Sequence, residues 1–204
     1  MLFIYLLGLS IFILFINKIL LKNKILINET GDVHQKFSSK SSVPLTGGIF
    51  IFFGFFFFNE GILSVIFFSF IILILGVLSD LKLIISAKKK LLIQIFFILF
   101  YTVFNDFQIT DTRIGFLDII LNYSYMNYLF VTFCILIIVN GSNFIDGMNT
   151  LCIGYYLLIT VVIYYLQFNH LIMIENIHVL YIFIVISFAF IINLKNKFFL
   201  GDSG

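Results

Sequence analysis

The sequence predicts an all-α fold, a polytopic helix bundle embedded in a membrane, and three observations support this prediction. Hydrophobic residues make up 62% of the 204 residues, and the mean hydropathy is +1.17. Charged residues make up only 11%, whereas soluble domains carry roughly 25%. The charges are also grouped, so that long uncharged stretches lie between them. Backbone groups inside lipid must form hydrogen bonds within their own segment, so these stretches are expected to be helices.

Seven uncharged stretches define the expected membrane spans within one transmembrane domain, residues 1–204. They cover residues 1–17, 41–59, 61–79, 91–105, 119–145, 147–174 and 176–194. Six reach the length of about 17–25 residues that a spanning helix needs. The seventh, 91–105, is shorter, but the stems of the neighbouring lysines 88–90 can reach the interface. The first stretch lacks a basic segment and a small-residue cleavage site, so we expect it to be a retained span.

The basic residues fix the expected orientation of these spans. Loops 18–40, 80–90, 140–149 and 195–204 should share one side of the membrane, and they hold eleven of the twelve basic residues. The opposite side holds only Arg113. By the positive-inside rule the lysine-rich loops are cytoplasmic and the N-terminus is outside. We therefore expect a multi-pass inner-membrane protein, with its polar motifs on the cytoplasmic face.

The expected outer loops and the two cysteines carry less chemical information. Asn59-Glu60-Gly61 is predicted to be a tight turn. Residues 106–126 are expected to form a short hairpin or an interfacial helix, with Tyr123, Tyr125 and Tyr128 at the membrane interface and solvated acids at positions 106, 111 and 118. Cys134 and Cys152 lie inside apolar stretches and are interpreted as small buried hydrophobes rather than a disulfide or a metal pair.

The first two inner loops contain candidate substrate-binding residues. The first holds His34 and Lys36 and continues into Pro44-Leu45-Thr46-Gly47-Gly48, where the proline suits the first turn of a helix and the glycines allow close backbone approach. An ordinary basic loop leading into a helix is the alternative. The second holds Asp80 at the lipid boundary, where an unpartnered acid is costly and therefore indicates function. Lysines 88–90 either bind a phosphate or serve topology and anionic lipid headgroups.

The last two inner loops each place an acid beside a glycine, in Asp146-Gly147 and Gly201-Asp202. Mg²⁺ prefers oxygen ligands and is usually held by one or two carboxylates together with substrate phosphates. If Asp80, Asp146 and Asp202 meet on one membrane face, they can form such a site. The neighbouring amides, Asn140, Asn143 and Asn149, are suited to a nucleotide or a sugar.

At these positions the sequence resembles the polyprenyl-phosphate N-acetylhexosamine-1-phosphate transferases, glycosyltransferase family 4. The nearer members are the enzymes that transfer N-acetylglucosamine-1-phosphate to undecaprenyl phosphate. Phospho-N-acetylmuramoyl-pentapeptide transferase is a more distant member. The resemblance extends over essentially the whole chain, in order. It comprises His34 with P-L-T-G-G at 44–48, G-V-L-S-D at 76–80, N-G-S-N-F-I-D-G-M-N at 140–149 and F-L-G-D-S-G at 199–204. The last two motifs are the most specific.

The resemblance implies that N-acetylhexosamine-1-phosphate passes from a UDP-sugar to undecaprenyl phosphate, with release of UMP and a requirement for Mg²⁺. This would begin the synthesis of a surface polysaccharide such as O-antigen or a wall glycan. By position, Asp202 is implied as the metal-binding acid, with Asp80 as a second metal and lipid-phosphate residue. Asn143 and Asp146 are implied at the nucleotide–sugar end, and Lys36 and Lys90 at phosphates. The implied partners are the two substrates and membrane lipid, with a homodimer left open and no nucleic acid.

Two substitutions and the position of the last motif depart from the family pattern. The usual pair of acids is Ser79-Asp80 here, and the acid three residues after Asp146 is replaced by Asn149. Family members continue with further helices and a histidine-bearing loop after the F-L-G-D motif. We therefore expect residues 1–204 to be the N-terminal part of a longer transferase domain, inactive or nearly so alone.

Two other functions remain open at this point. A non-catalytic remnant that binds partners would explain the missing acids. A transporter would explain the apolar spans, but its ionisable groups would be expected near the middle of the membrane.

Overall fold

A computed structural model describes residues 2–28, 42–56, 63–84, 86–146, 150–169 and 176–204. Within these residues the chain forms eight α-helices, one 3₁₀ helix and a two-stranded antiparallel sheet. The fold is therefore nearly all-α, as the sequence predicts. The predicted turn at residues 59–61, together with His34, Lys36 and Asn149, lies outside the described residues.

Each of the seven predicted spans contains a helix. These helices are α1 (Leu2–Asn23), α2 (Gly47–Phe56), α3 (Leu63–Asp80), α4 (Ala87–Phe104), α6 (Ser124–Ile145), α7 (Leu151–Phe168) and α8 (Asn176–Leu194). By length and composition, α1, α3, α6 and α7 can each cross a membrane. Helix α4 is also 18 residues long, but it begins among lysines 88–90. The structure confirms a helical membrane bundle.

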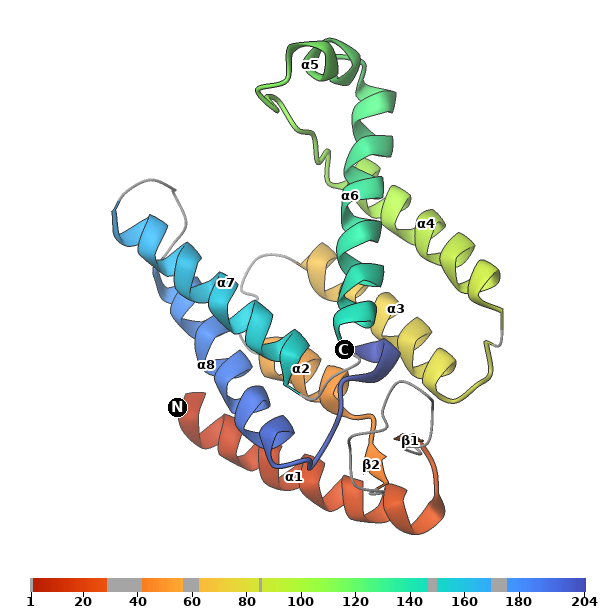
Figure 1. Cartoon of the computed structure of the whole chain (residues 1–204), viewed down its shortest axis with the longest axis vertical. Helices are drawn as coiled ribbons and strands as arrows, with labels where there is room; N and C mark the ends of the chain where they lie inside the picture. The colour runs from red at the N-terminus through yellow and green to blue at the C-terminus, as the bar shows by residue number, and fades with distance from the viewer. Residues whose placement is uncertain (1, 29–41, 57–62, 85, 147–149, 170–175) are drawn as a thin grey trace.

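The helices pack in two groups that meet near the C-terminus of the chain (Figure 1). Helix α7 runs along α8, and α2 packs against α8, α1 and α3. Helix α4 runs along α6, and both extend away from the rest of the molecule toward α5 (Gly115–Leu121). The 3₁₀ helix η1 (Gly201–Ser203) packs against the ends of α2 and α3, so the last sequence motif lies at the meeting point.

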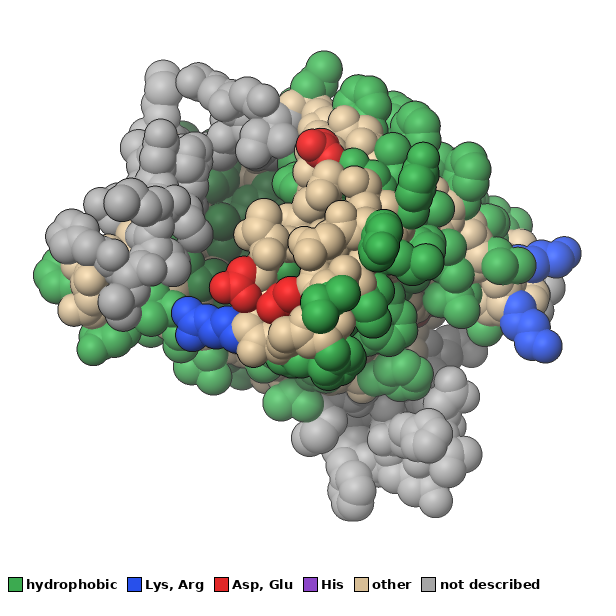
Figure 2. Space-filling view, turned by 90° about the horizontal axis from the view of Figure 1, so that it is seen from above, with side chains coloured by type: hydrophobic (Ala, Val, Ile, Leu, Met, Phe, Trp, Pro, Cys, Tyr) green, Lys and Arg blue, Asp and Glu red, His purple; other side chains and the backbone are tan. Residues whose placement is uncertain are grey.

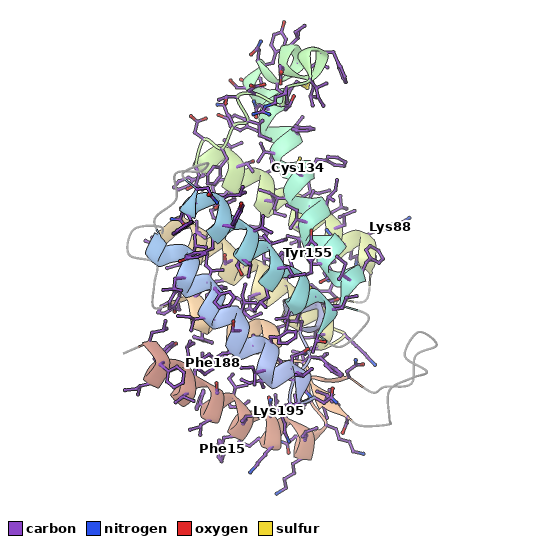
Figure 3. All side chains as sticks on the ribbon, turned by 60° about the vertical axis from the view of Figure 1, so that its left-hand side comes forward. Phe15, Lys88, Cys134, Tyr155, Phe188 and Lys195 are labelled. Atoms are coloured by element: carbon purple, nitrogen blue, oxygen red, sulfur yellow. The ribbon has the colours of Figure 1, made fainter. Side chains whose placement is uncertain are left out.

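Hydrophobic side chains dominate the outer surface, as expected for a protein in lipid. The face in Figure 2 is mostly hydrophobic, with few acidic or basic side chains. In Figure 3, Phe15 points away from the other helices, and its exposed fraction is 61%. The same figure places Lys88 at the beginning of α4 and Lys195 just beyond α8. The core between α1, α2 and α8 contains Phe50 and Phe198, which are fully buried with ring centroids 5.7 Å apart.

The prediction for Pro44 changes in the structure. Pro44 does not begin the second span, because that helix starts at Gly47. Instead Pro44 belongs to strand β2 (Val43–Pro44), where it pairs with Ile27 of β1 (Ile27–Asn28). The proline is tolerated there because the sheet has only two short strands, so its missing N–H interrupts little.

Residues 106–126, which the sequence places in an outer loop, contain the helix α5 and no strand, so the helical alternative is the one adopted. The segment before α5 is held by Asn127, whose side chain bonds the backbone N–H and carbonyl of Ile109. Asp118 lies within α5 rather than in a loop, and hydrogen bonds from the hydroxyl and N–H of Thr112 lower its pKa. Tyr123 and Tyr125 are exposed, as interface anchors would be.

Candidate active site

The segment before η1 is bound to the turn that begins α2. Phe199 donates its N–H to the carbonyl of Pro44, and Gly47 donates its N–H to the carbonyl of Phe199, each at 2.9 Å. A Cβ atom at Gly47 would lie 2.9 Å from the same carbonyl oxygen. The motifs 44–48 and 199–204, far apart in sequence, therefore form one backbone-to-backbone contact.

Glycines allow the backbone of η1 to lie directly on α2 and α3. A Cβ atom at Gly48 would lie 2.0 Å from the carbonyl oxygen of Ser203, and one at Gly76 would lie 2.4 Å from that of Asp202. Atoms of real side chains do not approach a backbone this closely, so only glycine fits at positions 48 and 76. Gly201 adopts a positive φ of +67°, a conformation that also favours glycine. The glycines of three motifs thus set the position of Asp202.

Two buried asparagines, from α1 and α8, also bind the backbone of the segment before η1. Asn17 in α1 donates to the carbonyl of Lys197 at 2.9 Å, and Asn193 in α8 donates to the carbonyl of Phe198 at 2.8 Å. Asn193 also accepts the N–H of Thr150 at 2.8 Å. Since Thr150 directly follows the third motif, residues 140–149, in the sequence, one side chain connects the end of that motif to the fourth. Both asparagines are almost fully buried, at 3% and 1% exposure.

Asp202 is held by three neighbours. Its backbone N–H donates to Asp80 Oδ1 at 2.8 Å. Its Oδ2 accepts a hydrogen bond from the Ser79 hydroxyl at 2.5 Å and forms an ion pair with the Lys90 ammonium at 2.8 Å. Burial alone would raise the pKa of Asp202, but the hydrogen bonds from Lys90 and Ser79 and the charge of Lys90 outweigh it, so the pKa lies below its ordinary value.

Asp146 lies beside these two acids, directly after the end of α6. Burial raises its pKa, a hydrogen bond from the backbone N–H of Gly201 lowers it, and the charges of Asp80 and Asp202 raise it further, to about 7. Asp146 can therefore exchange a proton near neutral pH. The structure brings the three predicted acids to one end of the bundle, around Gly201.

A cavity of about 270 Å³ opens beside Asp202. Its polar lining comes from α3, α4, α6 and η1, and Phe144 adds an aromatic side chain at the rim that is 88% exposed. The polar lining residues are Ser79, Lys90, Asn140, Asn143 and Asp202. Four residues singled out from the sequence, namely Lys90, Asn140, Asn143 and Asp202, are therefore gathered around one space. Lys88 and Lys89 are exposed and do not line it.

Comparison with known proteins identifies the family of this chain. The model for glycosyl transferase family 4 matches residues 62–204, which include the motifs at 76–80, 140–149 and 199–204. The chain belongs to glycosyl transferase family 4. No curated protein and no solved structure matches the chain. At the family level, the match supports transfer of a sugar phosphate to polyprenyl phosphate by a membrane-embedded transferase.

The chemistry of this family 4 site fits a hard divalent cation. Asp80 Oδ2 is buried and has no hydrogen-bond partner among the described residues, and such an orphaned carboxylate oxygen is costly unless something binds it. Carboxylates and amides supply the oxygen ligands that Mg²⁺ prefers. In the described part of the chain no three acidic, histidine or cysteine side chains already surround one point. Asp80 and Asp202 as metal ligands therefore remain a prediction.

The buried polar residues that hold this family 4 site together were not predicted from the sequence. Asn17, Asn193 and Thr46 are almost fully buried, and the Thr46 hydroxyl donates to Asn17 Oδ1 at 2.8 Å. The available signal was an amide at or near the end of an apolar stretch, at position 17 of the stretch 1–17 and position 193 of the stretch 176–194. Such a side chain must find a partner when it is buried, so it indicates a specific contact even when its partner is unknown.

Proposed function

We propose that this chain binds a UDP-linked N-acetylhexosamine and undecaprenyl phosphate in the cavity beside Asp202, to transfer the sugar phosphate to the lipid. In this reaction an oxygen of the lipid phosphate attacks the sugar-bearing phosphorus of the UDP-sugar. The bond from that phosphorus to the bridging oxygen breaks, and UMP leaves with the electron pair. The product is a lipid diphosphate that carries the sugar and begins a surface polysaccharide.

The convergence of Lys90, Asp202, Asn140 and Asn143 on one cavity in a family 4 chain carries this proposal. The lipid phosphate is already a nucleophile, so the protein needs mainly to position two phosphates and to neutralise charge. Lys90, 12% exposed and aimed at the cavity, supplies a cation for a phosphate. The two amides supply donors and acceptors for the nucleotide–sugar end.

The three acids have separate proposed roles. Asp202 and Asp80 would hold Mg²⁺, which when bound offsets the negative charge of the phosphates. Asp80 is the last residue of α3, at the lipid boundary that the sequence predicts, which favours its assignment to the lipid phosphate. Asp146 would contact the nucleotide–sugar end, since it belongs to the same motif as Asn140 and Asn143, which line the cavity. We propose further that this end of the bundle is cytoplasmic in a bacterial inner membrane, as the lysines predict.

The first test is nucleotide binding by the purified 204-residue chain in lipid nanodiscs. Equilibrium dialysis with labelled UMP should detect binding that requires Mg²⁺, is lost in Asp202→Asn and is unchanged in Ser86→Ala. Ser86 precedes α4, and its hydroxyl makes no capping hydrogen bond. Absence of Mg²⁺-dependent UMP binding in a folded wild-type chain would refute the proposed function and would favour a transporter or a binding protein.

The second test identifies the donor sugar. Membranes that contain the chain are supplied with undecaprenyl phosphate and either labelled UDP-N-acetylglucosamine or labelled UDP-N-acetylgalactosamine. Transfer predicts label in the lipid extract together with an equal amount of released UMP. UMP binding without label in the lipid would assign a substrate site to residues 1–204 but no turnover.

A further inference from the structure

The side chain that stands in place of the family's first acid, Ser79, contacts the proposed metal acid directly. Ser79 lies in the last turn of α3, one residue before Asp80. Its hydroxyl is 2.5 Å from Asp202 Oδ2, and the Lys90 ammonium is 2.8 Å from the same oxygen. Both donors therefore use one carboxylate oxygen.

The other oxygen of Asp202 is left for a ligand. Among the described residues, no hydrogen bond or ion pair reaches Asp202 Oδ1. The side chain is 39% exposed and lines the cavity of about 270 Å³. A carboxylate with one oxygen occupied by two donors presents its second oxygen in a fixed direction, because rotation of the carboxylate would break both bonds. This arrangement resembles that of outer partners that orient a metal ligand.

A serine at position 79 acts differently from an acid at the same position. A carboxylate there would place a second negative charge against Asp202 Oδ2 and would repel it unless a cation lay between them. A hydroxyl instead donates a hydrogen bond to that oxygen, so Asp202 stays in place without any bound cation. The structure thus gives the substitution at Ser79 a physical role.

We propose that Ser79 is a positioning residue, which with Lys90 binds Asp202 Oδ2 and thereby orients Oδ1 to bind a divalent cation in the cavity. This inference rests on the proposed function, since it assumes that Asp202 binds the cation. The chain would then hold the cation with fewer protein carboxylates than an enzyme with two adjacent acids, so substrate phosphates would complete more of its coordination.

The test measures Mn²⁺ binding by the full chain in nanodiscs, from the electron paramagnetic resonance signal of free Mn²⁺. Ser79→Ala removes the donor and is expected to raise the Mn²⁺ dissociation constant roughly tenfold, the effect of one hydrogen bond to a charged group. Ser79→Thr keeps the hydroxyl and should stay within about twofold of wild type. Ser86→Ala is the matched control, a serine nearby whose hydroxyl makes no capping bond, and it should bind as wild type. If Ser79→Ala does not fold, Ser79→Cys, which keeps the size but donates only weakly, replaces it.

The outcomes separate this inference from the proposed function. Mn²⁺ binding that is equal in wild type and Ser79→Ala overturns the inference, and so does a wild-type chain that binds no Mn²⁺. A Ser79→Thr variant as weak as Ser79→Ala also overturns it, because the hydroxyl would then not be the active group. Loss of Mn²⁺ binding in Ser79→Ala with rescue in Ser79→Thr supports it, even where UMP does not bind and the proposed function fails.

Discussion

Substitution of Gly48 by alanine tests whether the glycine motif at 44–48 positions the acid of the last motif. The added Cβ atom would lie 2.0 Å from the carbonyl oxygen of Ser203, 2.3 Å from its carbonyl carbon and 2.7 Å from the nitrogen of Gly204. All three are backbone atoms, so no side-chain rotation relieves the overlap. Either η1 or the beginning of α2 must move by about 1 Å or more, since atoms in contact need roughly 3.5 Å.

The expected cost follows from this overlap. Overpacking a well-packed site costs typically 1–3 kcal/mol, and an overlap with three backbone atoms belongs near the upper value, about 3 kcal/mol. For a chain of this size such a loss lowers the thermal midpoint by roughly 6–12 °C. Displacement of η1 also moves Asp202, one residue before Ser203, so UMP binding should weaken more than stability alone requires.

The matched control is Gly141→Ala, because Gly141 lies in α6 near the cavity and a Cβ atom there meets nothing within 4 Å. This substitution should be neutral or should stabilise the helix by up to about 1 kcal/mol. Thermal aggregation in detergent, followed by gel filtration, gives both midpoints, and equilibrium dialysis gives UMP binding. If Gly48→Ala matches Gly141→Ala in both measurements, the contact between the two motifs does not exist as described.

Three further predictions use other parts of the structure. The pKa of Asp146 is raised in the folded state, so its proton stabilises the fold fully below about pH 4, and this stabilisation is lost as the pH rises through about 7. The thermal midpoint of wild type minus that of Asp146→Asn should therefore fall between these pH values. A difference that does not change with pH would contradict this prediction. Asn193→Leu removes the hydrogen-bond partners of the Phe198 carbonyl and the Thr150 N–H, so the free energy of unfolding should fall by about 1–3 kcal/mol for each group left unsatisfied. As a control, Asn169→Ala at an exposed position should change the thermal midpoint little. The chain contains no tryptophan, so Phe116→Trp places a single fluorescent reporter on α5, where Phe116 is 69% exposed. If α5 lies at the membrane interface, the tryptophan emission should be blue-shifted and quenched by brominated lipids. Emission typical of tryptophan in water would show that α5 lies off the membrane.

The arrangement of the spans was predictable because a membrane imposes few choices. In lipid a long uncharged stretch must form a helix, so all seven predicted spans contain one. Helix ends were less certain. The sequence predicts the second span from residue 41, but α2 begins only at Gly47, because residues 43–44 pair with β1 and so satisfy backbone groups outside a helix. Pairing with a strand 16 residues earlier leaves no local pattern in the sequence.

The candidate site was predictable in its residue types and only partly in its contacts. Acids at the ends of apolar stretches are costly, so Asp80, Asp146 and Asp202 could be singled out, and topology required them to share a face. Nothing in the sequence specifies that Asp202 donates its N–H to Asp80, or that Lys90, rather than the adjacent lysines, reaches Asp202. The phase of α4 decides that choice, and it depends on how α4 packs against α3 and α6.

The glycines and the acids of this protein depend on one another. At the lipid boundary an acid needs partners, and the nearest unpaired donors are the backbone N–H groups of a short helix such as η1. Asp80 and Asp146 each accept one of these N–H groups, from Asp202 and Gly201 respectively. Those bonds form only because Gly48 and Gly76 let η1 lie directly on α2 and α3. A larger residue at either glycine would therefore leave two buried carboxylates short of a partner, and the fold and the proposed site would fail together.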